Sequence, residues 1–329
     1  MKTQQNIWNK VLPFRSTKYT QTILRSCYEI NREKESEALA FQNTYPFIYY
    51  LEHGEKYFSQ VQTAPIELRP VLLFYGMVQL MKACLLLKDP HYPETSQVLA
   101  HGVTTRKRKK SQYVFLDDEV KIQKNGLLTH FSEKMFHVKH FSSEKYKMRL
   151  LLRQIFEMHT LFTQIENMKR PYFIQFTENN LTIPAALLDE FQFGISSFCS
   201  YISERSKQKF QSHLDVNKDQ RSKDLHITGS APICSTQCHP FLFASTGNYY
   251  LSPYKNELLD IPEIIVHYLI LYNLSMICRY ETEWWGELFH HYPDKDYPFI
   301  YHFLSVAAEK VPLLLFSIME KQVTASTPK

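Results

Sequence analysis

The chain has 329 residues and an ordinary globular balance, with 44% hydrophobic and 22% charged residues. This length suits one large domain or two ordinary ones with an ample core. Only 8 glycines stand beside 21 tyrosines and 23 phenylalanines. Few glycines argue against a nucleotide-binding fold built on glycine-rich turns, which need positive φ and close backbone approach. The net charge of +5 permits an anionic partner without requiring one.

The sequence predicts a soluble, cytoplasmic protein that does not enter a membrane. The first residues, MKTQQNIWNKVLPF, have no continuous apolar segment and no small-residue cleavage site. The longest apolar run, near 264–278, is shorter than the roughly 20 residues that span a bilayer. Six scattered cysteines are typical of free thiols in a reducing compartment: Cys27, Cys84, Cys199, Cys234, Cys238 and Cys278.

The first third of the chain predicts helices. One begins after Ser16, and a second runs over about 33–58 with a break or kink at Pro46, because proline removes a backbone donor and clashes with the preceding turn. Proline is also a good start signal, so Pro70 begins an almost wholly apolar helix over 70–87. Lys82 is the only charge inside this helix.

The middle of the chain predicts mixed structure. Extended runs at 119–123 and 127–131 flank Asn125-Gly126, which predicts a β-hairpin because both turn residues tolerate positive φ. A helix is expected from Ser142 to about Ile165, with Ser143 as its cap. Short strands are expected over PYFIQF, NLTIP, DLHIT and GNYYLSP, with helical pieces near 185–192 and 203–213.

The stretch Pro262–Trp285 is the expected centre of the fold. From Ile264 to Cys278 it is apolar on all sides of a helical wheel, which is typical of a helix wrapped by its own domain. We expect it to pack on helix 70–87, to leave a polar, aromatic-rich tail at its end, and to be followed by a loop and a last helix over about 296–323.

These elements predict a mainly α fold with a β-containing insertion, an α+β class whose buried helices 70–87 and 262–280 pack together. We expect one domain over 1–329. Its alternative is two interleaved halves, a helical one (1–100 with 255–329) and a mixed insertion (101–254).

The sharpest local feature is a run of five cations just after His101: Arg106, Lys107, Arg108, Lys109 and Lys110. Such a block can bind phosphates because it releases counterions from a polyanion. The aromatic side chains of Tyr113 and Phe115 follow it and could stack on bases. The alternative is a solvated loop whose charges only aid solubility.

A second candidate surface lies at the end of the central helix. Arg279 stands among Tyr280, Trp284 and Trp285, a set suited to stacking on a planar ligand or clamping a protein partner. The alternative is structural, because a cation in the last helical turn caps free carbonyls and complements the helix dipole.

Two weaker patterns suggest chemistry. Arg153 and His159 fit the loose Arg-x(4–6)-His spacing of helical ribonucleases of the HEPN type, a spacing that also arises by chance. Cys234, Cys238, His239 and His226 could ligate zinc, although structural zinc sites usually pair two ligand knuckles and no second knuckle exists.

Three further histidines, His130, His137 and His140, could also line up as metal ligands. No carboxylate is placed in the sequence to orient them, so we expect them to be histidines on an aromatic surface. No catalytic residue, metal site or cofactor is therefore predicted.

Several stretches resemble the YaaC-like family of Gram-positive bacteria: PVLLFYGMVQLMKACLL, HGVTTRKRKK, YLILYNLSMICRYETEWW, NTYPFIYYLEHG and VKIQKNGLLTHFSEKMFHVKH. The resemblance covers nearly the whole chain. It implies a cytoplasmic bacterial protein and supplies no catalytic residues. It also implies a link to IMP dehydrogenase, whose gene often neighbours those of the family, and so to purine metabolism.

The sequence therefore predicts a non-enzymatic interaction or regulatory protein. It would bind a protein partner, with IMP dehydrogenase as one candidate, or a phosphate-bearing ligand. The predicted binding residues are His101, the basic run 106–110, and Arg279 with Tyr280, Trp284 and Trp285. The alternatives are a nucleic-acid-binding protein or HEPN-like ribonuclease, and a plain structural adaptor.

Overall fold

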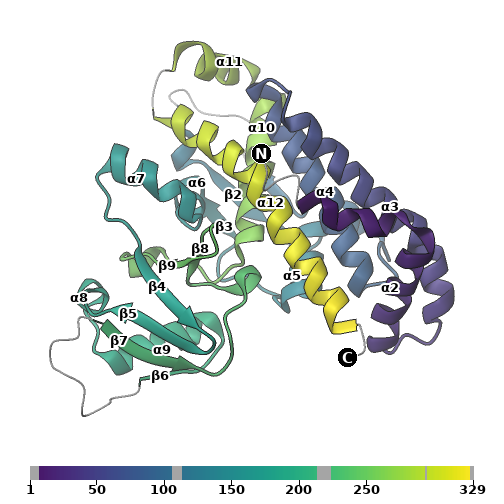
Figure 1. Ribbon diagram of the computed structural model, residues 1–329. Helices are drawn as coiled ribbons and strands as arrows, with labels where there is room; N and C mark the ends of the chain where they lie inside the picture. Colours follow the sequence, from purple (N-terminus) through teal and green to yellow (C-terminus); the bar gives the residue numbers. More distant parts are fainter. Residues whose placement is uncertain (1–6, 106–112, 213–223, 293–294, 327–329) are drawn as a thin grey trace. The chain divides into compact units, whose positions relative to one another are not determined.

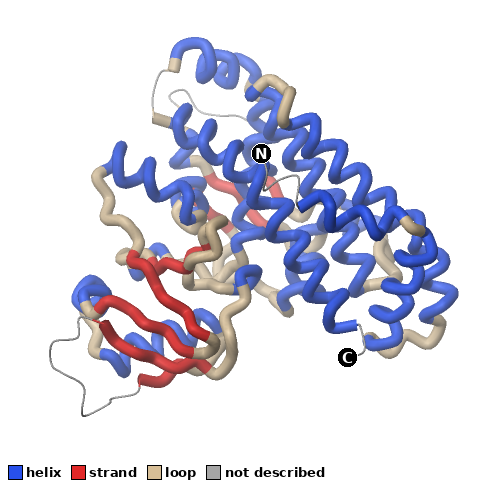
Figure 2. The backbone as a smooth tube through the Cα atoms, viewed as in Figure 1, coloured by secondary structure: helices blue, strands red, loops and turns tan. Residues whose placement is uncertain are grey.

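The structure is a computed structural model that describes residues 7–105, 113–212, 224–292 and 295–326. The fold is mainly helical with two antiparallel sheets in the middle of the chain, which confirms the predicted fold class (Figures 1 and 2). The chain divides into two compact units. Unit 1 comprises Met1–Met148 and His267–Lys329, and unit 2 comprises Arg149–Val266. Unit 1 thus includes residues 101–148, which the two-halves alternative places in the insertion.

Unit 1 contains the long helices and a small sheet. Its helices are η1 (Asn9–Arg15), α2 (Thr17–Ile30), α3 (Ser36–Val61), η2 (Ile66–Leu68), α4 (Arg69–Lys88), η3 (Ser96–Leu99), η4 (Phe115–Asp117), α5 (Leu127–Phe136), most of α10 (Glu263–Tyr280), α11 (Thr282–His291) and α12 (Asp296–Ser326). Its strands are β1 (Val103–Thr105), β2 (Glu119–Ile122) and β3 (Lys145–Lys147), in the order β1-β2-β3.

The two central buried helices, α4 and α10, pack together as predicted. The ring of Phe74 lies 5.2 Å from that of Tyr268 and 5.6 Å from that of Tyr272. Just before α4, the carbonyl of Glu67 accepts a hydrogen bond from Cys278 near the end of α10. The start of α4 therefore meets the end of α10, so the two helices are antiparallel.

Two helices are long and apolar enough to cross a membrane by length and composition alone, Ile66–Lys88 and Asp296–Ser326. Each of these helices is longer than the 264–278 run, which the sequence pattern indicated as the longest apolar segment. The apolar window of each is 72% buried inside the protein, and α12 packs against α4 in unit 1. Such burial is the ordinary property of core helices.

The N-terminal helices are largely as expected. The Ser16 side chain accepts a hydrogen bond from the Tyr19 amide and caps α2, which begins at Thr17. Of the break or kink predicted at Pro46, the break is wrong, because α3 continues through this residue from Ser36 to Val61. Packing against α2 and α4 holds the helix on both sides of the proline and outweighs its one missing hydrogen bond.

The predicted hairpin at 119–131 is also wrong. Strand β2 pairs with β1 and β3 on its two sides, and the returning segment is helix α5. Gly126 has the positive φ expected of a turn (137°), but it serves a close approach: a Cβ there would lie 2.3 Å from Gly102. The amide of Leu127 then donates to the Ala100 carbonyl at 2.7 Å, which fixes the start of α5.

The single helix expected over 142–165 is replaced by shorter elements. The segment forms β3, α6 (Met148–Leu152), η5 (Phe156–Met158) and α7 (His159–Glu166). The Ser143 hydroxyl accepts from the Lys145 amide and donates to its carbonyl, so it makes a local turn instead of a helix cap. Strand pairing of Tyr146 with Val120 overrides the helical periodicity here.

Unit 2 is built on an antiparallel sheet in the order β6-β7-β5-β4-β9-β8. The strands are β4 (Tyr172–Thr177), β5 (Asn180–Pro184), β6 (Phe210–Ser212), β7 (Asp224–Gly229), β8 (Leu242–Phe243) and β9 (Tyr249–Leu251). Helices α8 (Ala186–Phe191) and α9 (Ile195–Ser206) pack on it through a core that includes Ile174, Ile183 and Phe198, and η6 (Ser235–Gln237) and η7 (Lys255–Glu257) complete the unit.

The expected strands all form, and so does the helical piece near 185–192, as α8. The helical piece near 203–213 is displaced: α9 ends at Ser206 and residues 210–212 form β6. The loop expected directly after Trp285 is wrong, because helix α11 continues through this position to His291. The last helix is confirmed as α12.

Candidate functional site

The five cations Arg106, Lys107, Arg108, Lys109 and Lys110 lie outside the residues that the structure describes. The described chain stops at Thr105, the last residue of β1, and begins again at Tyr113. The anion-binding role of this run therefore stays a prediction. Its neighbour His101 is described and marks the candidate site.

His101 lies in a cluster of aromatic rings in unit 1. Its ring centre is 5.0 Å from that of Phe74, 6.2 Å from that of Tyr75 and 5.8 Å from that of Tyr272. The Tyr268 hydroxyl donates to the His101 carbonyl at 2.9 Å. Both buried helices, α4 and α10, thus hold this residue, and its half-buried imidazole sits between their tyrosines.

Each of the two helices beside His101 carries a cation. Lys82 is two turns after Tyr75 on α4, and Arg279 is two turns after Tyr272 on α10, so each cation shares a helix face with a tyrosine. Side chains lean toward the N-terminus of their helix. Because α4 and α10 are antiparallel, Lys82 and Arg279 lie beyond opposite ends of the ring cluster around His101, and each leans back toward it.

The electrostatics agree with this placement. Burial lowers the pKa of His101, and the charges of Arg279 and then Lys82 lower it further. Burial also lowers the pKa of Lys82. Burial raises the pKa of Tyr272, and the nearby Arg279 charge partly offsets that rise. The site therefore concentrates positive charge beside a neutral imidazole.

No carboxylate neutralises these cations within the described parts of the chain. The nitrogen of Lys82 lies 5.5 Å from the ring centre of Tyr50 on α3. The Arg279 guanidinium donates to the Ser275 carbonyl at 3.0 Å and lies 3.1 Å from the Met276 sulfur. Both cations keep N–H groups free for an anion. We call Tyr75, Lys82, His101, Tyr272 and Arg279 the cationic–aromatic site.

The other predicted residues at the end of α10 have separate roles. Tyr280 is 66% exposed, with the Arg279 guanidinium 5.3 Å from its ring centre. Trp284 packs edge-on against Tyr113 at 4.7 Å. Trp285 is buried, and its indole donates to the Glu67 carbonyl at 3.0 Å. Trp285 therefore anchors α11 to the segment before α4.

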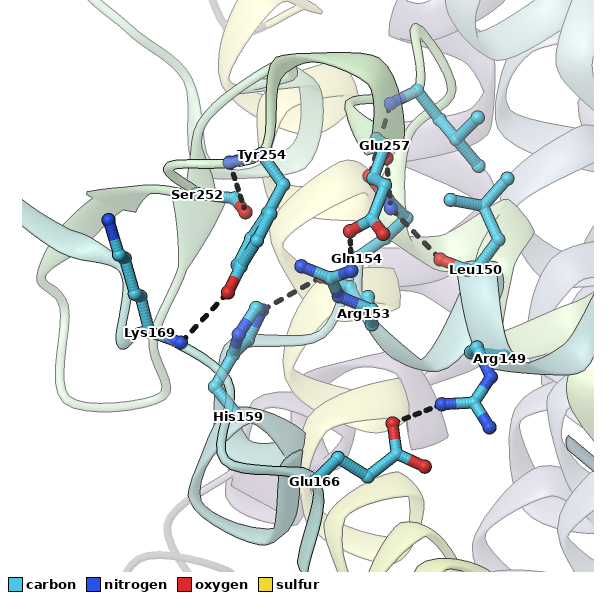
Figure 3. A network of polar contacts seen from close by, with 11 residues as sticks. Arg149, Leu150, Arg153, Gln154, His159, Glu166, Lys169, Ser252, Tyr254 and Glu257 are labelled. Carbon is cyan, nitrogen blue, oxygen red and sulfur yellow. Dashed lines mark hydrogen bonds and ion pairs between the residues drawn. The ribbon is translucent and has the colours of Figure 1, made fainter. Parts of the chain in front are cut away.

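Arg153 and His159 meet as the ribonuclease spacing requires (Figure 3). Both are buried, at 3% and 4% exposure. The imidazole Nε2 donates to the Arg153 carbonyl at 2.9 Å. The guanidinium pairs with Glu257 and lies 4.5 Å from the ring centre of Tyr254. Burial lowers the pKa of Arg153 to about 10 and that of His159 to about 4. A scissile phosphate needs an exposed pair, so this geometry does not support the ribonuclease alternative.

The zinc alternative is not supported by a cluster of ligands among the described residues. In the part of the chain that the structure describes, no group of three or more His, Cys, Asp or Glu side chains could hold a metal ion. The Cys238 thiol is buried and donates to the Phe241 carbonyl at 3.3 Å. Cys234 lies 3.0 Å from the Thr236 hydroxyl. These thiols have local structural contacts.

One histidine expected to lack a carboxylate does have one. The His130 Nε2 lies 2.9 Å from a carboxylate oxygen of buried Asp89, and Lys134 joins the same carboxylate at 3.0 Å. The ring of His130 also stacks on Tyr92. Asp89 follows α4, far from His130 in sequence, so spacing could not reveal this contact.

Sequence reasoning also missed most of the cationic–aromatic site. It named His101 and Arg279 separately but omitted Tyr75, Lys82 and Tyr272. A signal was present for Lys82, because it is the single charge in an otherwise apolar helix. A lone cation on a largely buried helix costs free energy to desolvate, so it is a residue for which a partner or ligand should be sought.

The comparisons with known proteins identify a family. A model of the family described as YaaC-like Protein matches residues 12–319. No curated protein and no solved structure shows a significant match to the chain. The family match confirms the resemblance of the sequence stretches and adds no activity.

Proposed function

The chain belongs to the YaaC-like family, and from that premise we propose that it is a non-enzymatic regulatory protein that binds a phosphate-bearing ligand at the cationic–aromatic site. What supports the proposal is that the positive charges of Lys82 and Arg279 both act on His101, with no neutralising carboxylate for either cation among the described residues. Two uncompensated cations that are partly desolvated attract an anion more strongly than solvated surface charges do.

The neighbouring rings extend the proposal to the shape of the ligand. Tyr75 stacks on Tyr57 of α3 at 6.3 Å, and Tyr272 stands on the other side of His101. Aromatic faces beside an arginine favour a planar group attached to the anion. The neutral imidazole of His101 can donate or accept one hydrogen bond.

The test measures binding of inorganic pyrophosphate by calorimetry in wild type, Lys82→Met and Arg279→Gln. These variants remove each charge and keep much of each side chain. Lys18→Ala is the matched control, because Lys18 is an exposed cation on α2 in the same unit. A charge-assisted hydrogen bond contributes about 1.5–3 kcal/mol, so each site variant should weaken binding by roughly 10- to 100-fold. Equal affinity in all four proteins would refute the proposal.

A protein partner is the second candidate, and purification from native lysate tests it. The resemblance names IMP dehydrogenase as one partner to look for, and the family match supports that resemblance. A variant with neutral residues at 106–110 shows whether the basic run contributes. Nucleic acid recovered with a steep salt dependence would favour the nucleic-acid-binding alternative. We retain a cytoplasmic location as part of this proposal.

A further inference from the structure

Helix α12 and the N-terminal helices of unit 1 form a pocket of about 220 Å³, which we call the η1–α12 pocket. The residues that line it belong to η1, α2, α3 and α12. Its lining includes the apolar side chains of Phe14, Leu51, Phe316, Met319 and Val323. Leu51, Phe316 and Met319 are buried residues of the core. The pocket therefore reaches the core and is not a flat patch on the surface.

Aromatic contacts hold two walls of the η1–α12 pocket in place. The ring centre of Phe14 lies 5.3 Å from that of Phe47 and 5.5 Å from that of Tyr19. The ring of Phe316 meets that of Trp8 edge-on at 5.2 Å. Walls that are fixed in this way need little rearrangement when a ligand enters, which is usual for sites that bind small molecules.

An ion pair marks the opening of the η1–α12 pocket. Lys10 and Glu320 both line the pocket, and the Lys10 Nζ lies 2.7 Å from a carboxylate oxygen of Glu320. Their side chains are 44% and 52% exposed, whereas the apolar floor is buried. An ion pair this exposed contributes little to the stability of a fold. Its charges can therefore bind a ligand with little loss of stability.

The two charges at the opening restrict the chemistry of that ligand. An apolar carboxylate would pair with Lys10 but would place a second negative charge beside Glu320, and an apolar amine would repel Lys10 in the same way. A free α-amino acid carries an ammonium and a carboxylate on the same carbon. Its carboxylate can accept a hydrogen bond from Lys10 while its ammonium donates one to Glu320, so both charges are matched.

The volume of the η1–α12 pocket selects the side chain of the amino acid. An apolar cavity of about 150 Å³ holds one benzene molecule. A pocket of about 220 Å³ therefore has room for a benzene ring and the carbon that links it to the backbone. The rings of Phe14 and Phe316 favour an aromatic ligand, because aromatic rings attract one another in edge-on and offset arrangements. Among the apolar amino acids, phenylalanine fits these requirements best.

We propose that the η1–α12 pocket binds a free apolar α-amino acid, with phenylalanine as the best-fitting one. The side chain of the amino acid enters the apolar interior beside Phe14 and Phe316. Its charged groups stay at the opening, against Lys10 and Glu320. The pocket shares no residue with the cationic–aromatic site, so this binding does not rest on the proposed function.

A ligand-observed NMR titration of the full chain tests the chemistry of the ligand. L-Phenylalanine should bind with a Kd on the order of 1 mM or tighter. Phenylacetate lacks the ammonium and 2-phenylethylamine lacks the carboxylate, so each should bind about 3- to 10-fold more weakly. Glycine lacks the apolar side chain and should show no binding. No binding of L-phenylalanine up to about 10 mM would overturn the proposal, and equal affinity for the three phenyl compounds would overturn the requirement for both charges.

Two substitutions test the place of binding. Glu320→Gln should weaken L-phenylalanine about 3- to 10-fold without weakening phenylacetate, which has no ammonium to lose. Lys10→Gln should weaken L-phenylalanine by a similar factor without weakening 2-phenylethylamine. The matched control is Glu29→Gln, because Glu29 forms an equally exposed ion pair with Arg25 on α2, and it should change no affinity. Circular dichroism confirms that each variant is folded. Unchanged affinity for L-phenylalanine in both pocket variants would exclude this pocket as its site.

Discussion

Acid should destabilise unit 2 through His159. This residue is 4% exposed at the start of α7, and burial lowers the pKa of its imidazole from 6.5 to about 4. The unfolded chain protonates the same histidine near pH 6.5. Between pH 6.5 and pH 4 the unfolded state therefore binds a proton that the folded state excludes, and the free energy of unfolding falls as the pH falls.

The size of the effect follows from the two pKa values. At pH 5, protonation of His159 stabilises the unfolded state by about 2 kcal/mol relative to the folded state. The variant His159→Gln retains an N–H that can donate to the Arg153 carbonyl and does not titrate. Wild type should therefore lose about 2 kcal/mol more than the variant between pH 7.5 and pH 5.

The assay must follow unit 2 alone. All 3 tryptophans, Trp8, Trp284 and Trp285, belong to unit 1, so their fluorescence follows that unit. Hydrogen exchange of peptides from 149–266 measures unit 2 instead. His53→Gln is the control, because His53 is exposed. Burial also lowers the pKa of His239 to about 4, so the comparison of wild type with His159→Gln isolates one histidine. The same pH dependence in both proteins would refute the reasoning.

Three further substitutions, one of them with a matched control, test the fold. Burial alone would raise the pKa of Asp89, but hydrogen bonds, first from His130, lower it to about 2. The resulting stabilisation is present above pH 3.8 and is lost as the pH falls toward 2. Asp89→Asn should therefore cost about 2 kcal/mol at pH 7 in urea unfolding, and the free energy of unfolding of the variant should depend less on pH in acid. Gly126→Ala should destabilise unit 1 by more than about 1 kcal/mol in thermal melts, because Gly126 has a positive φ and lies against the backbone of Gly102. The control is Gly286→Ala, which should be neutral or stabilising because Gly286 has open space around it inside α11. Arg153→Ala should lower the stability of unit 2, measured by hydrogen exchange, by about 3 kcal/mol. This value is at the lower end for a broken buried ion pair, because the partner carboxylate is 34% exposed. A cost near zero would contradict a structural role for the ion pair.

The sequence alone determined the parts of the fold that local patterns encode. An all-round apolar pattern identified α4 and α10 as buried helices, and their shared burial correctly indicated that they pack together. The strands of unit 2 were found because β-branched and aromatic residues alternate between turns. Arg279 was named because it stands among aromatic residues, and His101 because the basic run 106–110 follows it.

Where local sequence patterns competed with distant contacts, only the tertiary structure decided which element forms. The Asn125-Gly126 turn signal was read as a hairpin, but close approach of Gly126 to Gly102 starts a helix there. Helical periodicity after Ser142 yielded to pairing of β3 with β2. Proline in α3 was tolerated because neighbouring helices hold both sides of it.

Tertiary structure also decided which residues make up the candidate site. Lys82 and Arg279 are almost two hundred residues apart, and their charges both act on His101 only because α4 and α10 pack together beside it. Likewise, Arg153 and His159 fit a catalytic spacing in sequence, but their burial gives them a structural role. Spacing along the chain shows which residues can meet, whereas burial and helix direction decide which of them meet in reach of a ligand.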